Sequence, residues 1–286
     1  MIRSSGAVEA LRDAALSALL VACSTHASTH ASTHDASVTD AGSAHHVATD
    51  AAAPREPLSG EWLQKLDLPN GGVAYLAPPL GSTEPRPVIV AVHGAMDHPS
   101  YMCSAWRVIA DAYAFVVCPA GRAAGDLYVW SSGEMIDSAI GAALAAARAR
   151  YGDRMIDAPM VYTAFSQGAT LAASVLTKPK SAHFARASLI EGGYHTLEDG
   201  YAAAFKKAGG ERVLYTCAQG GCVGSFGASK AALTAVGIPV KVESPGPFGH
   251  SMVPPVRASL NAALPWLTEG LPGWEGYATA PKLDAH

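Results

Sequence analysis

The strongest constraint on the fold is a regular alternation of short apolar runs with longer stretches of helical character, from Glu61 onward. Runs that favour strands lie at 62–68, 73–77, 88–92, 114–118, 159–165, 187–191, 212–217 and 239–243. Segments that favour helices lie at 101–113, 135–150, 167–177, 196–208, 227–236 and 252–266. Continuous β-branched runs between helices predict an α/β fold, with a mostly parallel central sheet and helices on both faces. The first two runs flank Asn70-Gly71-Gly72, a turn that predicts an antiparallel hairpin.

One junction between a strand and a helix carries a serine among small residues, in the segment Ala164-Phe165-Ser166-Gln167-Gly168. In the pattern G-x-S-x-G, such a sharp turn leaves the serine Oγ exposed at the end of the sheet. Ala164 replaces the first glycine with the next smallest residue. We therefore predict that Ser166 is a nucleophile. The alternative is an ordinary turn in which the serine caps the helix.

Two further segments follow predicted strands: His93-Gly94-Ala95-Met96, and Gly249-His250-Ser251-Met252 before the last helix. Together with the serine turn, they resemble the α/β-hydrolase family over about residues 61–270. The resemblance implies a serine hydrolase with Ser166 as nucleophile and His250 as general base, in the order serine, acid, histidine. It also implies that the N–H groups of Gln167 and of Ala95 or Met96 form the oxyanion hole, and that His93 is structural. His195 is the competing candidate for the base.

The acid of this family usually follows the strand that ends here at Cys217, but no aspartate or glutamate lies between Arg212 and Lys230. Glu191 ends the preceding strand, where some lipase-like members carry the acid, and it is our candidate. Alternatively, Glu191 has a structural role and catalysis uses a Ser–His pair alone. Glu243 is a poorer candidate, because it lies within the last strand.

The loop 119–133 is the predicted wall of a substrate pocket, with Tyr128 and Trp130 as its candidate residues. No large lid domain is expected, because only a few residues separate strand 187–191 from the following helix. An open and moderately apolar site suits carboxylic esters of small to medium size.

The first part of the chain has a different character. Residues 14–22 form a short apolar run that ends in Leu20-Val21-Ala22-Cys23, which resembles the lipobox of bacterial lipoproteins. We expect a signal peptide at 1–22, a lipidated Cys23, a Ser/Thr/His/Ala-rich tether at 23–58 and the hydrolase domain at 59–286. This implies an exported protein held by lipid at the outer membrane or cell surface. The alternative is an amphipathic N-terminal helix with an incidental cysteine.

Four more cysteines remain once Cys23 is set aside. An even number in an exported chain predicts two disulfides, Cys103–Cys118 and Cys217–Cys222, and the alternative is four buried thiols. No two of them show the C-x₂-C spacing of zinc sites, so we expect no metal there. The histidines of the tether, beginning with the repeat at His26, His30 and His34, are expected to belong to a polar spacer.

A net charge of −4 without any basic block argues against a nucleic-acid partner. The sequence therefore predicts a carboxylesterase without a cofactor that acts as a monomer on esters of small to medium size. Two other functions stay open: a catalytically weak or inactive binding protein with the same fold, and a peptidase or amidase.

Overall fold

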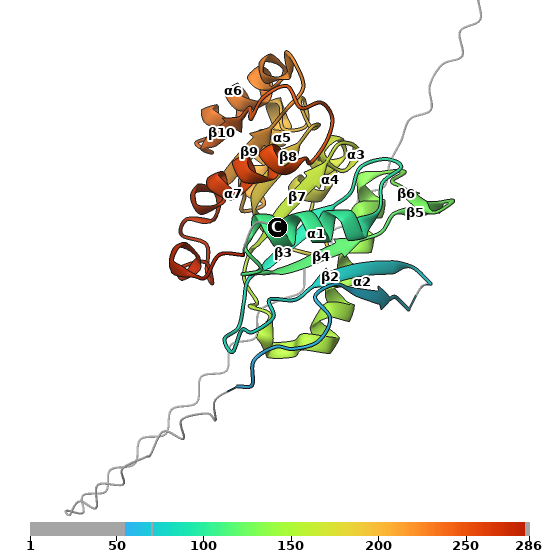
Figure 1. Cartoon of the computed structure of the whole chain (residues 1–286). Helices are drawn as coiled ribbons and strands as arrows, with labels where there is room; N and C mark the ends of the chain where they lie inside the picture. The colour runs from blue at the N-terminus through green and yellow to red at the C-terminus, as the bar shows by residue number, and fades with distance from the viewer. Residues whose placement is uncertain (1–54, 70, 284–286) are drawn as a thin grey trace, which may run out of the picture. The chain divides into compact units, whose positions relative to one another are not determined.

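The computed structural model describes residues 55–69 and 71–283, and these form an eight-stranded sheet with helices on both faces (Figure 1). Its strands are β1 (Gln64–Asp67), β2 (Val73–Ala77), β3 (Val88–Val92), β4 (Phe115–Pro119), β7 (Met160–Phe165), β8 (Phe184–Ile190), β9 (Arg212–Thr216) and β10 (Val240–Glu243). Their spatial order is β1-β2-β4-β3-β7-β8-β9-β10. The β1–β2 and β2–β4 pairs are antiparallel and all later pairs are parallel. The predicted fold class is thereby confirmed.

Seven α-helices connect these strands within the described part of the chain. They are α1 (Pro99–Ile109), α2 (Gly133–Tyr151), α3 (Gln167–Thr170), α4 (Ala172–Thr177), α5 (Asp199–Lys207), α6 (Gly227–Ala235) and α7 (Pro254–Thr268). Short 3₁₀ turns lie at η1 (Gly152–Arg154), η2 (Cys222–Phe226) and η3 (Tyr277–Thr279). The single helix expected at 167–177 is interrupted at Leu171, so it forms α3 and α4 instead.

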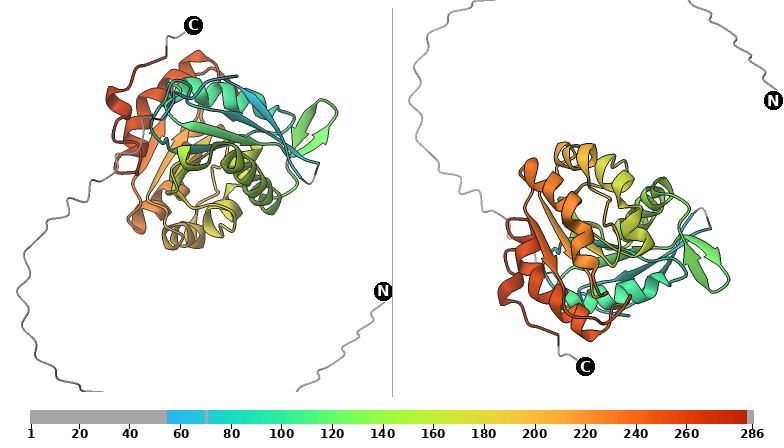
Figure 2. Two further views of the ribbon diagram at one scale, coloured as in Figure 1. Left: turned by 90° about the horizontal axis from the view of Figure 1, so that it is seen from below. Right: turned by 90° about the horizontal axis from the view of Figure 1, so that it is seen from above.

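The helices divide between the two faces of the sheet, as the views from above and below show (Figure 2). Helices α2, α4, α5 and α6 pack on one face, and α1 and α7 pack on the other. In β3, Val90 faces the first layer and Ile89 the second, since successive side chains point to opposite faces of a sheet. The central strands β3, β4, β7 and β8 are buried at every position, as expected for a sheet covered on both sides.

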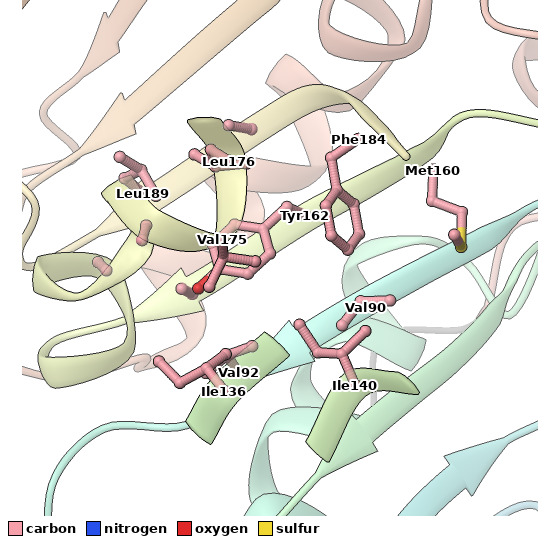
Figure 3. Packing of buried hydrophobic residues seen from close by; sticks show 14 of the residues in the cluster. Val90, Val92, Ile136, Ile140, Met160, Tyr162, Val175, Leu176, Phe184 and Leu189 are labelled. Carbon is pink, nitrogen blue, oxygen red and sulfur yellow. The ribbon is translucent and has the colours of Figure 1, made fainter. Parts of the chain in front are cut away.

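The larger core lies between the sheet and α2 and α4 (Figure 3). Tyr162 and Phe184, from neighbouring strands, meet edge to face at a ring-centroid distance of 5.4 Å. Ile140 of α2 and Val175 of α4 belong to the same fully buried cluster. This packing fixes the carboxyl ends of β7 and β8, from which the candidate site is built.

The predicted loop 119–133 is partly a hairpin of β5 (Arg122–Ala124) and β6 (Leu127–Val129), which corrects our expectation. Gly125, with φ of +68°, makes the reversal possible. Each of these strands has only three residues and none of them is buried, so neither forms the longer buried run by which a strand is recognised in the sequence.

The domain makes its first described contacts slightly before the expected boundary at residue 59. Arg55 forms an ion pair with Asp153, and the backbone of Leu58 is hydrogen-bonded to Ser82 and Gly81. The predicted signal peptide, Cys23 and nearly all of the tether lie outside the described residues. Among the residues described, no helix is long and apolar enough to cross a bilayer.

Candidate active site

Ser166 lies at the sharp turn between β7 and α3, as the motif predicts. Its backbone adopts φ of +51° and ψ of −113°, a conformation that residues other than glycine rarely take. Such a residue is strained by roughly 1–3 kcal/mol and persists only where its surroundings fix it. Here the Ser166 N–H donates to the carbonyl of Ile190 at 2.9 Å, and the Ser166 carbonyl accepts from the N–H of Thr170. The serine is therefore held by the sheet on one side and by the helix on the other.

Two glycines explain how the chain can turn so sharply at this point. A Cβ on Gly168 would lie 2.8 Å from the carbonyl oxygen of His93 and 2.7 Å from Val92 Cγ1. A Cβ on Gly192, on the neighbouring strand connection, would lie 2.5 Å from the carbonyl oxygen of Ser166. Both distances are too short for a real Cβ, so any larger residue would displace the serine turn.

His250 lies in the loop after β10 and meets the serine directly. Its Nε2 is 2.8 Å from Ser166 Oγ, and its ring packs against Phe165 at a centroid distance of 4.9 Å. The competing histidine, His195, is 73% exposed and is paired with Glu198 three residues further along the chain. Of the two candidate bases, His250 is the one that the structure places against Ser166.

Glu191 follows the last residue of β8, on the rung of the sheet next to Ser166, because Phe165 pairs with Ile190. Its side chain is fully buried, and its Oε2 lies 3.8 Å from His250 Nδ1. The backbone N–H of Ala218 donates to Oε1, so the buried charge is hydrogen-bonded. Glu243 instead accepts from Ser259 and pairs with Lys241. The structure thus brings Ser166, His250 and Glu191 together.

Gln219 is a residue of this site that the sequence reasoning did not identify. Its amide nitrogen lies 2.7 Å from Glu191 Oε2 and 3.0 Å from His250 Nδ1, between the two side chains. It also lies 3.3 Å from the hydroxyl of Tyr194. The expected acid after β9 is a carboxylate, and an amide three residues beyond the strand carries no comparable signal in the sequence.

The loop after β3 carries Ala95 and Met96, one of which is expected to donate its N–H to the oxyanion. Asp97 organises the turn by accepting from the N–H groups of Gly94 and His98. Met96 has φ of +52° and is 56% exposed. The loop is braced from the side, since Asp97 and Tyr128 exchange backbone hydrogen bonds.

Gln167, the other predicted donor, is the first residue of α3. Its N–H belongs to the first turn, where amides have no partner within the helix and are aligned with the positive end of the helix dipole. Its side-chain oxygen accepts from the N–H of Trp130 at 2.9 Å, which fixes the start of the helix.

Of the two residues expected to line a pocket, Trp130 is only 3% exposed, so it belongs to the interior of the domain and does not line an open pocket. Its indole stacks on His93 at 4.6 Å and donates to the His93 carbonyl. Tyr128 is half-buried and meets the ring of His98 at 5.4 Å. The correction for Trp130 follows from its size, because an indole beside a buried imidazole covers more apolar surface inside the domain than at a rim.

His93 is completely buried and accepts from the N–H of Gly121 through Nε2, while its Nδ1 lies 2.7 Å from the carbonyl of Gly94. These two contacts require a neutral ring with its proton on Nδ1. Burial lowers the pKa of His93 to about 4. The structural role implied for this histidine is consistent with this environment.

Both expected disulfides are present. Cys103–Cys118 joins α1 to β4, with 5.8 Å between the Cα atoms. Cys217–Cys222 closes the short loop after β9 that carries Ala218 and Gln219. Across residues 55–69 and 71–283, no group of three or more histidine, cysteine, aspartate or glutamate side chains is placed to hold a metal ion.

Neither the family models nor the curated proteins include a match to this chain. Solved structures, an esterase and a lipase among them, are nevertheless similar to it. Esterase PE8 superposes with a TM-score of 0.52 at 16% identity, over 71% of this chain and 100% of its own. A lipase in its open form gives 0.51 at 15% identity, over 71% and 96% of the two chains. TT1662 from Thermus thermophilus gives 0.51 at 17% identity, over 73% and 98%. The order of the strands, the serine turn and these similarities together show that the chain has the α/β-hydrolase fold.

Proposed function

We propose that this protein is a serine hydrolase that cleaves carboxylic esters through an acyl-enzyme intermediate. The observation that carries the proposal is the 2.8 Å contact between Ser166 Oγ and His250 Nε2, made at a strained turn at the end of β7. A nucleophile within hydrogen-bond reach of a base, with a buried carboxylate behind that base, is the arrangement that acyl transfer requires. The similarity to an esterase and to a lipase supports the same reaction class.

In the proposed reaction, Ser166 Oγ attacks the acyl carbon and its proton passes to His250 Nε2. The carbonyl oxygen becomes an oxyanion, which the N–H groups of Gln167 and of Ala95 or Met96 stabilise. His250 then protonates the leaving alcohol, and the C–O bond of the ester breaks. Water, activated by the same imidazole, hydrolyses the acyl-enzyme and returns the proton to Ser166. Glu191 stabilises the imidazolium that forms in both steps.

We further propose that the substrate is an uncharged ester of small to medium size. Only the residues 191–198 connect β8 to α5, so a large lid has no place in this connection. The exposed side chains of Met96 and Phe248, from the segments of the oxyanion loop and of His250, offer apolar contacts. Neither segment carries a lysine or arginine that would select an acidic substrate.

Export and attachment through a lipidated Cys23 are also proposals, and they depend on the sequence alone. The test is the migration of the full chain from cells grown with and without globomycin. An unprocessed precursor in treated cells is expected, and unchanged migration would argue against lipidation.

The activity is tested with a fluorophosphonate probe, which forms a covalent bond with an activated serine. The wild type should be labelled, and Ser166→Ala should not be. Ser174→Ala, on α4 of the same strand–helix unit, is the matched control and should be labelled like the wild type. A wild-type protein that folds but is not labelled would leave a binding role as the better explanation.

Substrate class is then tested with p-nitrophenyl esters from acetyl to palmitoyl and with the matching anilides. We expect the highest kcat/KM among the short and medium esters. Faster cleavage of the anilides would favour a peptidase or amidase instead.

A further inference from the structure

The amide nitrogen of Gln219 lies within hydrogen-bond distance of both His250 and Glu191. His250 Nδ1 and Glu191 Oε2 are 3.8 Å apart, beyond hydrogen-bond distance, whereas Gln219 Nε2 is within 3.0 Å of both. The imidazole and the carboxylate are therefore joined by hydrogen bonds through this amide, and not by a direct hydrogen bond between Nδ1 and Oε2.

The buried carboxylate fixes the orientation of the amide. If the amide were reversed, its oxygen would lie against Glu191 Oε2 with no proton between two acceptors. With nitrogen in that place, one N–H donates to Glu191 at 2.7 Å. The second N–H has His250 Nδ1 at 3.0 Å as its nearer acceptor and the Tyr194 hydroxyl at 3.3 Å as the more distant one.

A neutral imidazole that accepts at Nδ1 carries its proton on Nε2. That proton then points at Ser166 Oγ, so His250 donates to the serine. A general base needs the opposite tautomer, with a lone pair at Nε2 and the proton on Nδ1. The Nδ1 proton in turn needs an acceptor, and Glu191 Oε2 becomes one once the two atoms approach by about 1 Å.

We propose that Gln219 is a positioning residue that sets the tautomer of His250. With its amide in place, His250 carries its proton on Nε2 and the site is inactive. With the amide withdrawn, His250 donates from Nδ1 to Glu191 and can act as the general base. The change of tautomer is balanced. The Nε2 proton leaves to water and a proton from water binds Nδ1, through the 46% of the imidazole side chain that is exposed.

The surrounding contacts confine this movement to the side chain of Gln219. The loop that carries it is closed by Cys217–Cys222 and held to Glu191 by the Ala218 N–H. The Ala218 carbonyl accepts from the N–H of Gly249, which joins this loop to the segment of His250. The Gln219 side chain itself is half-buried, so it can swing toward solvent while the backbone stays in place.

The test reads the tautomer directly, by two-bond ¹H–¹⁵N correlation spectra of the full chain with ¹⁵N-labelled histidine. The signal of His250 is assigned as the one lost in His250→Asn. At a pH where the ring is neutral, the wild type should show the Nε2–H tautomer. Gln219→Met, which keeps the length but has no donor, should show the Nδ1–H tautomer. Gln219→Ala serves as a second variant in case the methionine does not fold.

Two further variants serve as controls for this comparison. Val223→Ala changes an exposed residue next to the same disulfide and should keep the wild-type tautomer. Gln219→Met combined with Glu191→Gln removes the charged acceptor and should reduce the Nδ1–H population. An Nδ1–H tautomer in the wild type, or an unchanged tautomer in folded Gln219→Met and Gln219→Ala, would overturn the proposal.

The kinetic part of the test rests on the proposed hydrolase function. Labelling by the fluorophosphonate should be several-fold faster in Gln219→Met than in the wild type, and slower labelling despite the change of tautomer would overturn the resting role. If neither protein is labelled, the hydrolase proposal fails, whereas the tautomer comparison still decides the role of Gln219.

Discussion

Ser166 and Glu191 occupy equivalent positions on neighbouring parallel strands. Each directly follows the last residue of its strand, and each has a positive φ, +51° and +53° respectively. Each is also held by a backbone hydrogen bond to the next strand, Ser166 to Ile190 and Glu191 to Thr216. The candidate nucleophile and the candidate acid thus have the same backbone conformation and the same kind of hydrogen bond, on adjacent strands.

Replacing Glu191 by glutamine tests whether its charge takes part in catalysis. The amide keeps the size of the side chain but cannot stabilise an imidazolium, so kcat should fall by about 100-fold or more. Steady-state kinetics on p-nitrophenyl acetate measures the change. Glu198→Gln, which alters the acid paired with His195, should leave kcat unchanged. Equal losses in both variants would remove Glu191 from the proposed mechanism.

The residues of the site differ in how far the sequence could predict them. Ser166 directly follows β7, a six-residue strand that is buried throughout, so its position at one edge of the sheet follows from the fold. His250 follows the short, half-buried strand β10 and is predictable from its place between the last strand and the last helix. Glu191 is predictable because it is a charged residue at the end of a buried strand. Gln219 is not predictable, because its role depends on distances of about 3 Å across a loop. Residue propensities for helix, strand and turn do not determine the conformation of such a loop.

At the scale of elements, the structure departs from the sequence prediction in two places near the site. The helix after Ser166 is broken at Leu171, and the loop after β4 contains the β5–β6 hairpin. Both segments are determined by contacts with other parts of the domain. Trp130 binds the side chain of Gln167, and Tyr128 pairs with Asp97, so the long-range partners decide their conformation.

The close contact of α3 with β3 gives a prediction at this scale. Gly168→Ala should destabilise the domain by roughly 1–3 kcal/mol, because the new methyl overlaps His93 and Val92. It should also reduce fluorophosphonate labelling, since the serine turn must shift. Urea unfolding and labelling rates measure the two effects.

The matched control is Gly200→Ala in α5, where a Cβ would meet no atom within 4 Å. It should be neutral or stabilise the protein by up to about 1 kcal/mol, as alanine favours helices. Similar losses of stability in the two variants would contradict the packing argument.

At the scale of the whole molecule, the sheet and its two helical layers were predictable, since they follow from the alternation of apolar runs. Which helices share a face was not, because this depends on the spatial order of the strands. That order also places His93 in the interior between β3 and the hairpin, where its ring must stay neutral.

The stability of the domain should therefore depend on pH through His93. Its pKa is lowered by burial from 6.5 to about 4, so the unfolded chain binds the proton more readily. The contribution is complete above pH 6.5 and declines as the pH falls toward 4, by up to about 3 kcal/mol. Urea unfolding at pH 7.5 and pH 4.5 should show this loss in the wild type. His93→Gln should show a smaller loss, and an identical pH dependence in both proteins would contradict the assignment.

The three members of the proposed triad differ in how firmly the backbone that carries them is held in place. Ser166 and Glu191 are fixed by hydrogen bonds of the sheet, but His250 belongs to an exposed connection that includes Gly246 and Gly249, both with positive φ. Its backbone is tied to the loop after β9 by a single bond, from Gly249 to Ala218. On warming, this connection would loosen while the strands remain intact. If the protein is the proposed hydrolase, its activity is expected to cease below the melting temperature and to return on cooling. The ten loop residues 244–253, and not the core, would then set its upper working temperature.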